Sequence, residues 1–333
     1  MRIPNIAFAL VTAIGWAMGA ADGVQAASPL ILEQTIPLDG VSGRIDHMAV
    51  DVAGRRLFVA ELGNGSVDVI DLQARKVTKR ISGLNEPQGL AYIADQDLIV
   101  VASAGDGSVR FFRAADLSSV GSIALGDDAD NVRTDPATGD VLVGYGDGGL
   151  AIIDPATRSK LDDIHLAGHP ESFQLDPKTD RVYVNVPDVD QIAVVDLNSR
   201  KQISAWKTPG LGSNFPMALA DGGGALAVVF RSPPRLAILN PATGAITASI
   251  ETCGDADDVF FDRKRDRFYV SCGEGAVDVV QRNPEGGLRA ERVATSSGAR
   301  TSIFVRQLDR LFVAARAKWL GSTAAILVYR PSP

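Results

Sequence analysis

The feature of this chain that most constrains its fold is an internal repeat with a period of about 41 residues. The unit at 169–207 shows the pattern clearly. A polar leading segment is followed by four short apolar segments, with turns rich in Asp, Asn, Gly and Pro between them. The segments of the other units fall in register with it. Seven units begin near Arg44, Glu86, Asp128, His169, Asn214, Asp255 and Ala299.

Four short β-branched segments per unit, with turn signals every few residues, predict the blades of a β-propeller. The apolar segments are continuous runs because neighbouring blades cover both faces of each blade. The sequence therefore predicts an all-β fold. We expect one domain over 27–333, a seven-bladed propeller of four-stranded antiparallel blades.

The last unit is one strand short, since it ends after its third strand at Tyr329. Residues 35–40 (TIPLDG) match the fourth strand of other units, such as SIALGD at 122–127. We therefore expect the segment 30–38 to form the outer strand of blade seven. This pairing closes the ring and removes an open sheet edge.

The segment RVYVNVPDVDQIAVVDLNSRK (181–201) resembles the repeat of the YVTN-type (YncE-like) β-propellers. The resemblance covers nearly all of the chain after residue 26. It implies the propeller fold and says little about function, since fold analogy carries no chemistry. The chain is also similar, more loosely, to lactonase propellers and to propeller lyases that hold a metal at the channel mouth. That similarity implies a metal-assisted hydrolase, lyase or epimerase.

The first 26 residues have the pattern of a secretory signal peptide. Arg2 precedes an apolar run at 6–21, and Val24-Gln25-Ala26 fits the small-x-small cleavage rule. We expect a mature chain from Ala27 that is periplasmic or secreted and monomeric, without a membrane span after cleavage. An uncleaved membrane anchor is the alternative.

Composition excludes several classes of function. The chain has 33 Lys and Arg against 40 Asp and Glu, a net charge of −7, so a nucleic-acid partner is not expected. No CxxCH motif is present for covalent haem. The glycine-containing loops precede strands and not helices, which argues against a nicotinamide site. The mature chain is also too poor in Trp for the docking motif of the propellers that bind PQQ. The expected partner is a small polar molecule or a periplasmic protein.

The loops that lead into the innermost strands, here called the leading loops, should converge at one mouth of the central channel. In register, they place one residue per blade around the axis: Asp46, Gln88, Asp130, Glu171, Pro216, Asp257 and Thr301. Polar residues also flank this column: Arg44, His47, Asn131, His169, Asp258 and Arg300.

Converging carboxylates repel each other, by roughly 2–3 kcal/mol for a pair about 6 Å apart, so cations, protons or arginines must relieve them. A divalent metal is one solution: Ca²⁺ if oxygen ligands dominate, and Mn²⁺, Fe²⁺ or Zn²⁺ if histidine binds. The expected metal ligands are Asp46, His47, Asp130, His169, Glu171 and Asp257. The expected catalytic residues are His47, His169 and Asp130, with Arg44 and Arg300 as anchors for a substrate carboxylate. Gln88, Asn131, Asp258 and Trp319 are expected at the rim of the ligand pocket.

The alternative for the same residues is structural. Asp and His in leading loops can cap backbone N–H groups and tie blades together, in a propeller that binds a ligand or a protein without catalysis. The two cysteines, Cys253 and Cys272, form a disulfide or remain free, because spacing alone does not decide the geometry.

Overall fold

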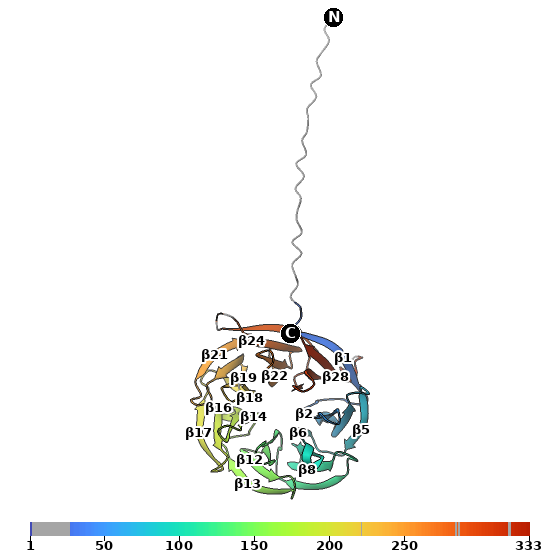
Figure 1. The fold of residues 1–333 in the computed structure, drawn as a ribbon, viewed down its shortest axis with the longest axis vertical. Coiled ribbons are helices and arrows are strands. Elements are labelled where there is room, and N and C mark those ends of the chain that lie inside the picture. Colours follow the sequence, from blue (N-terminus) through green and yellow to red (C-terminus); the bar gives the residue numbers. More distant parts are fainter. Residues whose placement is uncertain (2–26, 221, 284, 286, 319–320) are drawn as a thin grey trace.

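The structure is a ring of seven four-stranded antiparallel sheets around a central channel (Figure 1). It is a computed structural model that describes residues 1, 27–220, 222–283, 285, 287–318 and 321–333. The predicted seven-bladed propeller is confirmed. Nearly all of the predicted signal segment, residues 2–26, lies outside the described residues.

Each blade runs from an innermost strand at the channel to an outer strand at the rim. The innermost strands are β2 (Met48–Asp51), β6 (Pro87–Ile93), β10 (Val132–Thr134), β14 (Phe173–Asp176), β18 (Gly212–Ala220), β22 (Ala256–Asp262) and β26 (Ser302–Val305). The second strands are β3 (Arg56–Glu61), β7 (Leu98–Ser103), β11 (Val141–Tyr145), β15 (Arg181–Val186), β19 (Ala225–Ser232), β23 (Arg267–Cys272) and β27 (Arg310–Ala315).

The outer half of each blade is more exposed. The third strands are β4 (Ser66–Asp71), β8 (Ser108–Arg113), β12 (Gly149–Asp154), β16 (Gln191–Asp196), β20 (Pro234–Leu239), β24 (Ala276–Arg282) and β28 (Ala324–Pro331). The outer strands are β5 (Lys76–Ser82), β9 (Ser119–Ala124), β13 (Ser159–His165), β17 (Lys201–Lys207), β21 (Ile246–Glu251), β25 (Leu288–Ala294) and β1 (Leu30–Leu38). The helices are single 3₁₀ turns: Leu62–Asn64, Ala94–Gln96 and Pro187–Val189.

The N-terminal strand closes the ring, as predicted. β1 pairs antiparallel with β28 from Leu30 opposite Pro331 to Leu38 opposite Ala324. Ile36 and Leu38 of β1 are buried in the apolar layer between blades seven and one. The two ends of the chain are thus joined in a single sheet, and blade seven has no open outer edge.

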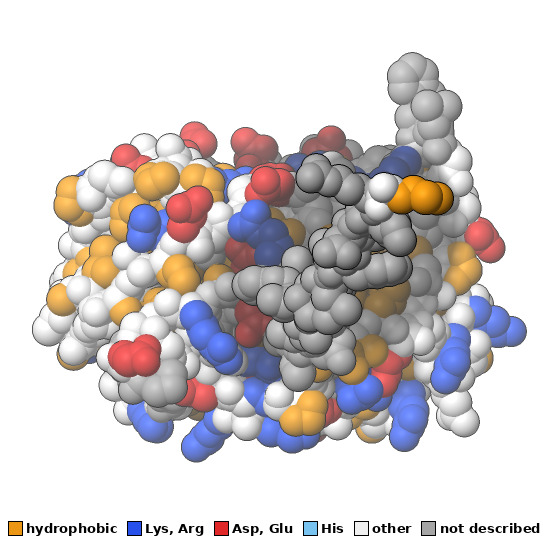
Figure 2. All heavy atoms as spheres, turned by 90° about the horizontal axis from the view of Figure 1, so that it is seen from above, with side chains coloured by type: hydrophobic (Ala, Val, Ile, Leu, Met, Phe, Trp, Pro, Cys, Tyr) orange, Lys and Arg blue, Asp and Glu red, His pale blue; other side chains and the backbone are white. Residues whose placement is uncertain are grey.

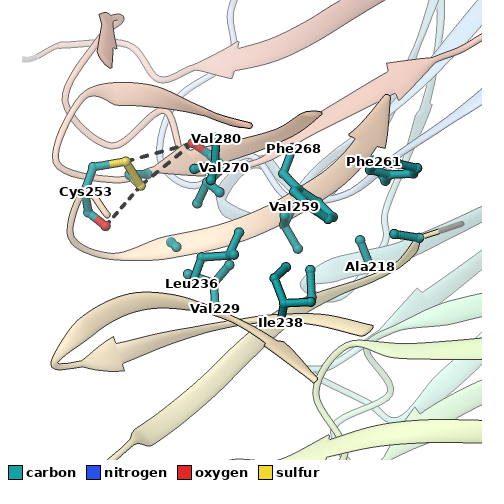
Figure 3. Close-up of a cluster of buried hydrophobic side chains, with 14 of the residues drawn as sticks. Ala218, Val229, Leu236, Ile238, Cys253, Val259, Phe261, Phe268, Val270 and Val280 are labelled. Carbon is teal, nitrogen blue, oxygen red and sulfur yellow. Dashed lines mark hydrogen bonds between the residues drawn. A yellow bond between two sulfur atoms is a disulfide. The ribbon is translucent and has the colours of Figure 1, made fainter. Parts of the chain in front are cut away.

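The core is distributed between blades. Seven apolar clusters are found among the described residues, and each lies at one interface between neighbouring blades. Figure 3 shows the interface of blades five and six, where Val229 and Ile238 face Val259 and Phe268. Since every blade is covered on both faces, the apolar runs of the sequence are explained.

The question that the sequence left open about the two cysteines is answered by the structure. Cys253 and Cys272 form a disulfide, with their Cα atoms 5.8 Å apart. Both residues are buried members of this cluster, and Cys253 lies at its edge in Figure 3. The disulfide ties the leading loop of blade six to the end of β23, and so it fixes the backbone just before Asp257.

In turns on the face opposite the leading loops, Asp carboxylates bind to the backbone of their own turn. Asp71, Asp154 and Asp196 end third strands and accept hydrogen bonds from backbone N–H groups two or three residues later. Short polar side chains of this kind stabilise turns. These acids therefore have a structural role in the blades.

Candidate functional site at the channel mouth

The leading loops enclose a cavity of about 310 Å³ on the channel axis. It is lined by Arg44, Asp46, His47, Gln88, Asp128, Asp130, Asn131, His169, Glu171, Ser172, Phe215, Arg231, Asp257 and Arg300. Ten residues that the sequence analysis placed at the site line this cavity. Asp258 lies deeper, in a second chamber of the channel. Trp319 lies outside the described residues.

His47 lies at the floor of the cavity, between carboxylates from three blades. Its Nε2 is 3.7 Å from an Asp46 oxygen and 3.9 Å from an Asp130 oxygen, and its Nδ1 is 3.8 Å from an Asp258 oxygen. Burial lowers the pKa of His47, but the three carboxylates outweigh it and raise the pKa to about 9. His47 is therefore a cation at neutral pH, and it acts as the counter-ion of the acids.

That charge limits the part that His47 can play in proton transfer. A general base must be able to accept a proton at the working pH, and a histidine with a pKa of about 9 is already protonated there. His47 retains a role in holding the carboxylates together.

One carboxyl oxygen of the cavity is buried without a hydrogen-bond partner within the described residues. It is Asp130 Oδ1, whose nearest cationic atom is His47 Nε2 at 3.9 Å, and the Glu171 side chain lines the same cavity. Burial, the largest cause, raises the pKa of Asp130 to about 8. Burial and the nearby Asp257 carboxylate raise the pKa of Glu171 to about 7. Both groups titrate near neutral pH, as acid and base catalysts do.

Two other acids of the mouth, Asp46 and Asp257, are paired with arginines. Arg44 donates to Asp46 at 2.8 Å, and Arg300 Nε lies 2.9 Å from an oxygen of Asp257. Arg231 also binds Asp257. The predicted anchors, Arg44 and Arg300, thus relieve the repulsion that the sequence analysis anticipated.

Arg231 reaches the site from the end of β19, in blade five. Its guanidinium lies 3.7 Å from the ring centre of Phe215 and donates to the Ala256 carbonyl at 2.7 Å. Phe215 is a site residue that the sequence does not predict, because it stands beside Pro216 in an otherwise polar column. The stacking fixes the guanidinium on the wall of the cavity.

His169 lies at the wall of the cavity near its opening. Its Nδ1 is 2.7 Å from the Gly146 carbonyl oxygen and 3.6 Å from an Asp128 oxygen, and its backbone N–H donates to Asp188. A carbonyl only accepts, so Nδ1 carries the proton. In the neutral ring, Nε2 is then free to accept a hydrogen bond from a ligand.

A bound cation requires its ligand atoms to lie close together. Ligand atoms around one Ca²⁺ lie roughly 3.3–3.7 Å apart, given bonds of about 2.4 Å. His47 Nε2 lies 3.7 Å from an Asp46 oxygen, at the upper limit of this range, and 3.9 Å from an Asp130 oxygen, beyond it. Within the described residues, no group of three or more His, Cys, Asp or Glu side chains is arranged to hold a metal ion.

The described part of the chain contains no helix with the length and hydropathy of a membrane span. No protein-family model and no curated protein matches the sequence.

Solved structures do match the fold. A chain of Kuenenia stuttgartiensis hydrazine synthase superposes with a TM-score of 0.74 at 16% identity, covering 94% of this chain and 99% of that one. A chain from the crystal structure of a mitotic checkpoint complex superposes with a TM-score of 0.77 at 13% identity, covering 100% of both. At such low identity these similarities establish the propeller architecture and nothing about activity. Membership of the YVTN-type propellers stays a prediction from the repeat.

Proposed function

We propose that the protein binds a small polar molecule in the mouth cavity and exchanges protons with it, with Glu171 as the base and Asp130 as the acid. The observation that carries the proposal is the Asp130 carboxyl group, whose Oδ1 is buried without a hydrogen-bond partner in the described chain, in the cavity that Glu171 also lines. Buried polar groups normally have partners, and a ligand with hydroxyl or carbonyl groups supplies them.

The difference between the two pKa values supports the assignment of roles. At pH 7 Asp130, with a pKa of about 8, is mostly protonated and can donate, whereas Glu171, with a pKa of about 7, is half ionised and can accept. Two carboxyls with separated pKa values are a common arrangement of acid and base catalysts. Hydrolysis of a lactone, or lyase or epimerase chemistry on a sugar acid, needs such a pair.

The cationic side of the cavity supports an acidic or polyhydroxylated ligand. The Arg44 side chain is 41% exposed and keeps free donors beyond its contact with Asp46. A carboxylate of the ligand would bind there, while its hydroxyl groups reach Asp130 and the free Nε2 of His169.

The test is a thermal-shift screen of lactones and sugar acids, followed by turnover assays on the compounds that bind. Glu171→Gln and Asp130→Asn keep the shape of each side chain and remove its titration. Binding with turnover in the wild type, and turnover lost in both variants, supports proton transfer. If the wild type binds a compound without turning it over, and both variants still bind it, the protein is the non-catalytic alternative, a ligand-binding propeller.

A divalent cation, Ca²⁺, Mn²⁺, Fe²⁺ or Zn²⁺, is a second candidate for the same cavity. Its support is the convergence of the His47 imidazole and the carboxylates of Asp46 and Asp130, with His47 Nε2 3.7 Å and 3.9 Å from their oxygens. The cation would replace the proton of His47 as the counter-ion. Metal content of protein purified without chelator, with the melting temperature before and after EDTA, tests it. Absence of metal and of any EDTA effect contradicts a metal site.

We also propose that the chain is exported and works in the periplasm or outside the cell. The support is the signal pattern of residues 1–26. N-terminal sequencing of the protein from cell fractions tests this. A mature chain that begins at Ala27 is expected, and a full-length chain in the cytoplasm contradicts export.

A further inference from the structure

The channel contains a second chamber of about 380 Å³ beyond the mouth cavity, toward the opposite face. All seven innermost strands or their ends contribute to its wall. His47 is the residue that lines both spaces, so its imidazole separates them. The volume lies within the range of roughly 300–1,000 Å³ that small-molecule sites span.

The chamber contains a cation without a direct counter-ion. Arg133, from β10, donates to the Val132 carbonyl at 2.8 Å and to Ser172 Oγ at 3.5 Å. In the described chain no carboxylate lies within 4.0 Å of its guanidinium, whereas Arg44, Arg231 and Arg300 at the mouth all have such partners. Burial, the largest cause, lowers the pKa of Arg133, which reflects the cost of a desolvated cation.

The acid that lines the chamber does not neutralise Arg133 directly. Asp258 accepts a hydrogen bond from the backbone N–H of Ser302 at 2.7 Å, and its other oxygen faces His47. A second arginine, Arg306, is exposed where the chamber wall reaches the turn after β26. It donates to the Phe261 carbonyl at 3.3 Å and also has no carboxylate within 4.0 Å in the described chain.

Much of the remaining wall is apolar. Val50, Leu219, Phe260 and Ile303 line the chamber and are only partly buried, so they contact its interior. A ligand that satisfies both the guanidinium and this wall must combine an anionic group with an apolar body.

The surface charges favour the same class of ligand. In the edge-on view of Figure 2, Asp and Glu side chains lie mainly along the upper rim, and Lys and Arg side chains mainly along the lower rim. Exposed acids of loops on the mouth face are Glu86, Asp127, Asp147, Asp188 and Glu274. Exposed bases of turns on the opposite face include Arg55, Arg75, Arg158, Arg200, Arg263 and Lys264, and they outnumber the exposed acids of those turns, which include Asp95, Asp116, Asp180 and Asp266. This asymmetry attracts anions to the opposite face.

We propose that the second chamber is a binding site for a monocarboxylate with an aromatic or branched aliphatic body. The carboxylate pairs with Arg133, and the body packs on Val50, Leu219, Phe260 and Ile303. Arginine suits this role because its planar guanidinium binds a carboxylate with two parallel hydrogen bonds. The site is separate from the mouth cavity and does not depend on the function proposed for it.

Isothermal titration of the mature protein with phenylacetate tests the proposal. Phenylacetamide, which keeps the body without the charge, and acetate, which keeps the charge without the body, serve as matched probes. We expect phenylacetate to bind at least tenfold more tightly than either. Equal binding of phenylacetate and phenylacetamide, or no binding of phenylacetate at millimolar concentrations, overturns the proposal.

Arg133→Gln is expected to weaken phenylacetate binding about tenfold or more. Arg263→Gln makes the same charge change on the same face outside the chamber, and it should leave the affinity within about twofold. Should Arg133→Gln fail to fold, Leu219→Glu places a negative charge in the chamber and should abolish binding. Unchanged affinity in a folded Arg133→Gln or Leu219→Glu protein refutes the site.

Discussion

Replacement of His47 by Gln tests the electrostatics of the channel most sharply. The His47 side chain is 16% exposed and lies 3.7–3.9 Å from carboxylate oxygens of Asp46, Asp130 and Asp258. Its pKa of about 9 in the folded protein, against 6.5 ordinarily, corresponds to about 3 kcal/mol of folding stability. The variant should lose an amount of this order when His47 is charged.

The sign of the pH dependence follows from the direction of the pKa change. Because the folded-state pKa is raised, the stabilisation is fully present below pH 6.5 and disappears as the pH rises through 9. The gap in unfolding free energy between wild type and His47→Gln should therefore narrow from about 3 kcal/mol near pH 6.5 to almost nothing above pH 9.

Urea denaturation at intervals from pH 6.5 to 10, in EDTA to keep cations away, measures this gap. His165→Gln is the matched control, since His165 is exposed on β13 and the same substitution should change stability little at any pH. A gap that stays constant across this range, or that widens as the pH rises, would refute the assignment of His47 as a buried cation.

Three further predictions concern stability and the site. The double substitution Cys253→Ser and Cys272→Ser removes the disulfide that restricts the unfolded chain, and it should lower the free energy of unfolding, measured by urea denaturation, by about 3 kcal/mol. Equal urea midpoints for wild type and variant would contradict the pairing. Ile36→Ala should lower the free energy of unfolding by about 2–5 kcal/mol, because Ile36 is buried where β1 closes the ring. Ile31→Ala, on the exposed side of the same strand, should lower it by less than about 0.5 kcal/mol. Similar losses in both variants would argue against this orientation of β1. Asp130→Asn should leave the melting temperature at pH 7 unchanged or raised, since the carboxyl group is mostly protonated there and its buried Oδ1 accepts no hydrogen bond, and a large drop would show that Asp130 is a structural cap.

The fold was predictable because all seven blades of a propeller obey the same burial requirement. Each unit must bury two faces of a short sheet, so its apolar runs and turn residues recur in register. Even the closure by residues 30–38 followed from the missing fourth strand after Tyr329. The convergence of Asp46, Asp130 and Glu171 on one cavity could be anticipated for the same reason, since one position per blade meets the axis.

Charge states and pairings in the channel could not be predicted in this way. Which acid has a guanidinium partner depends on contacts between blades, such as Arg231 of blade five with Asp257 of blade six. The protonation of His47 depends on three carboxylates from three different blades. Arg133 was missed because it lies within an innermost strand, three residues beyond Asp130, where it faces the second chamber and not the mouth.

The most direct test of ligand binding at the mouth is a crystal structure of the mature protein with the compound that gives the largest thermal shift among lactones and sugar acids. The compound should lie in the cavity of the leading loops, within hydrogen-bond distance of Asp130, Glu171 and the free Nε2 of His169. A compound bound outside this cavity, or inside it without contact to either carboxyl group, would contradict the proposed function.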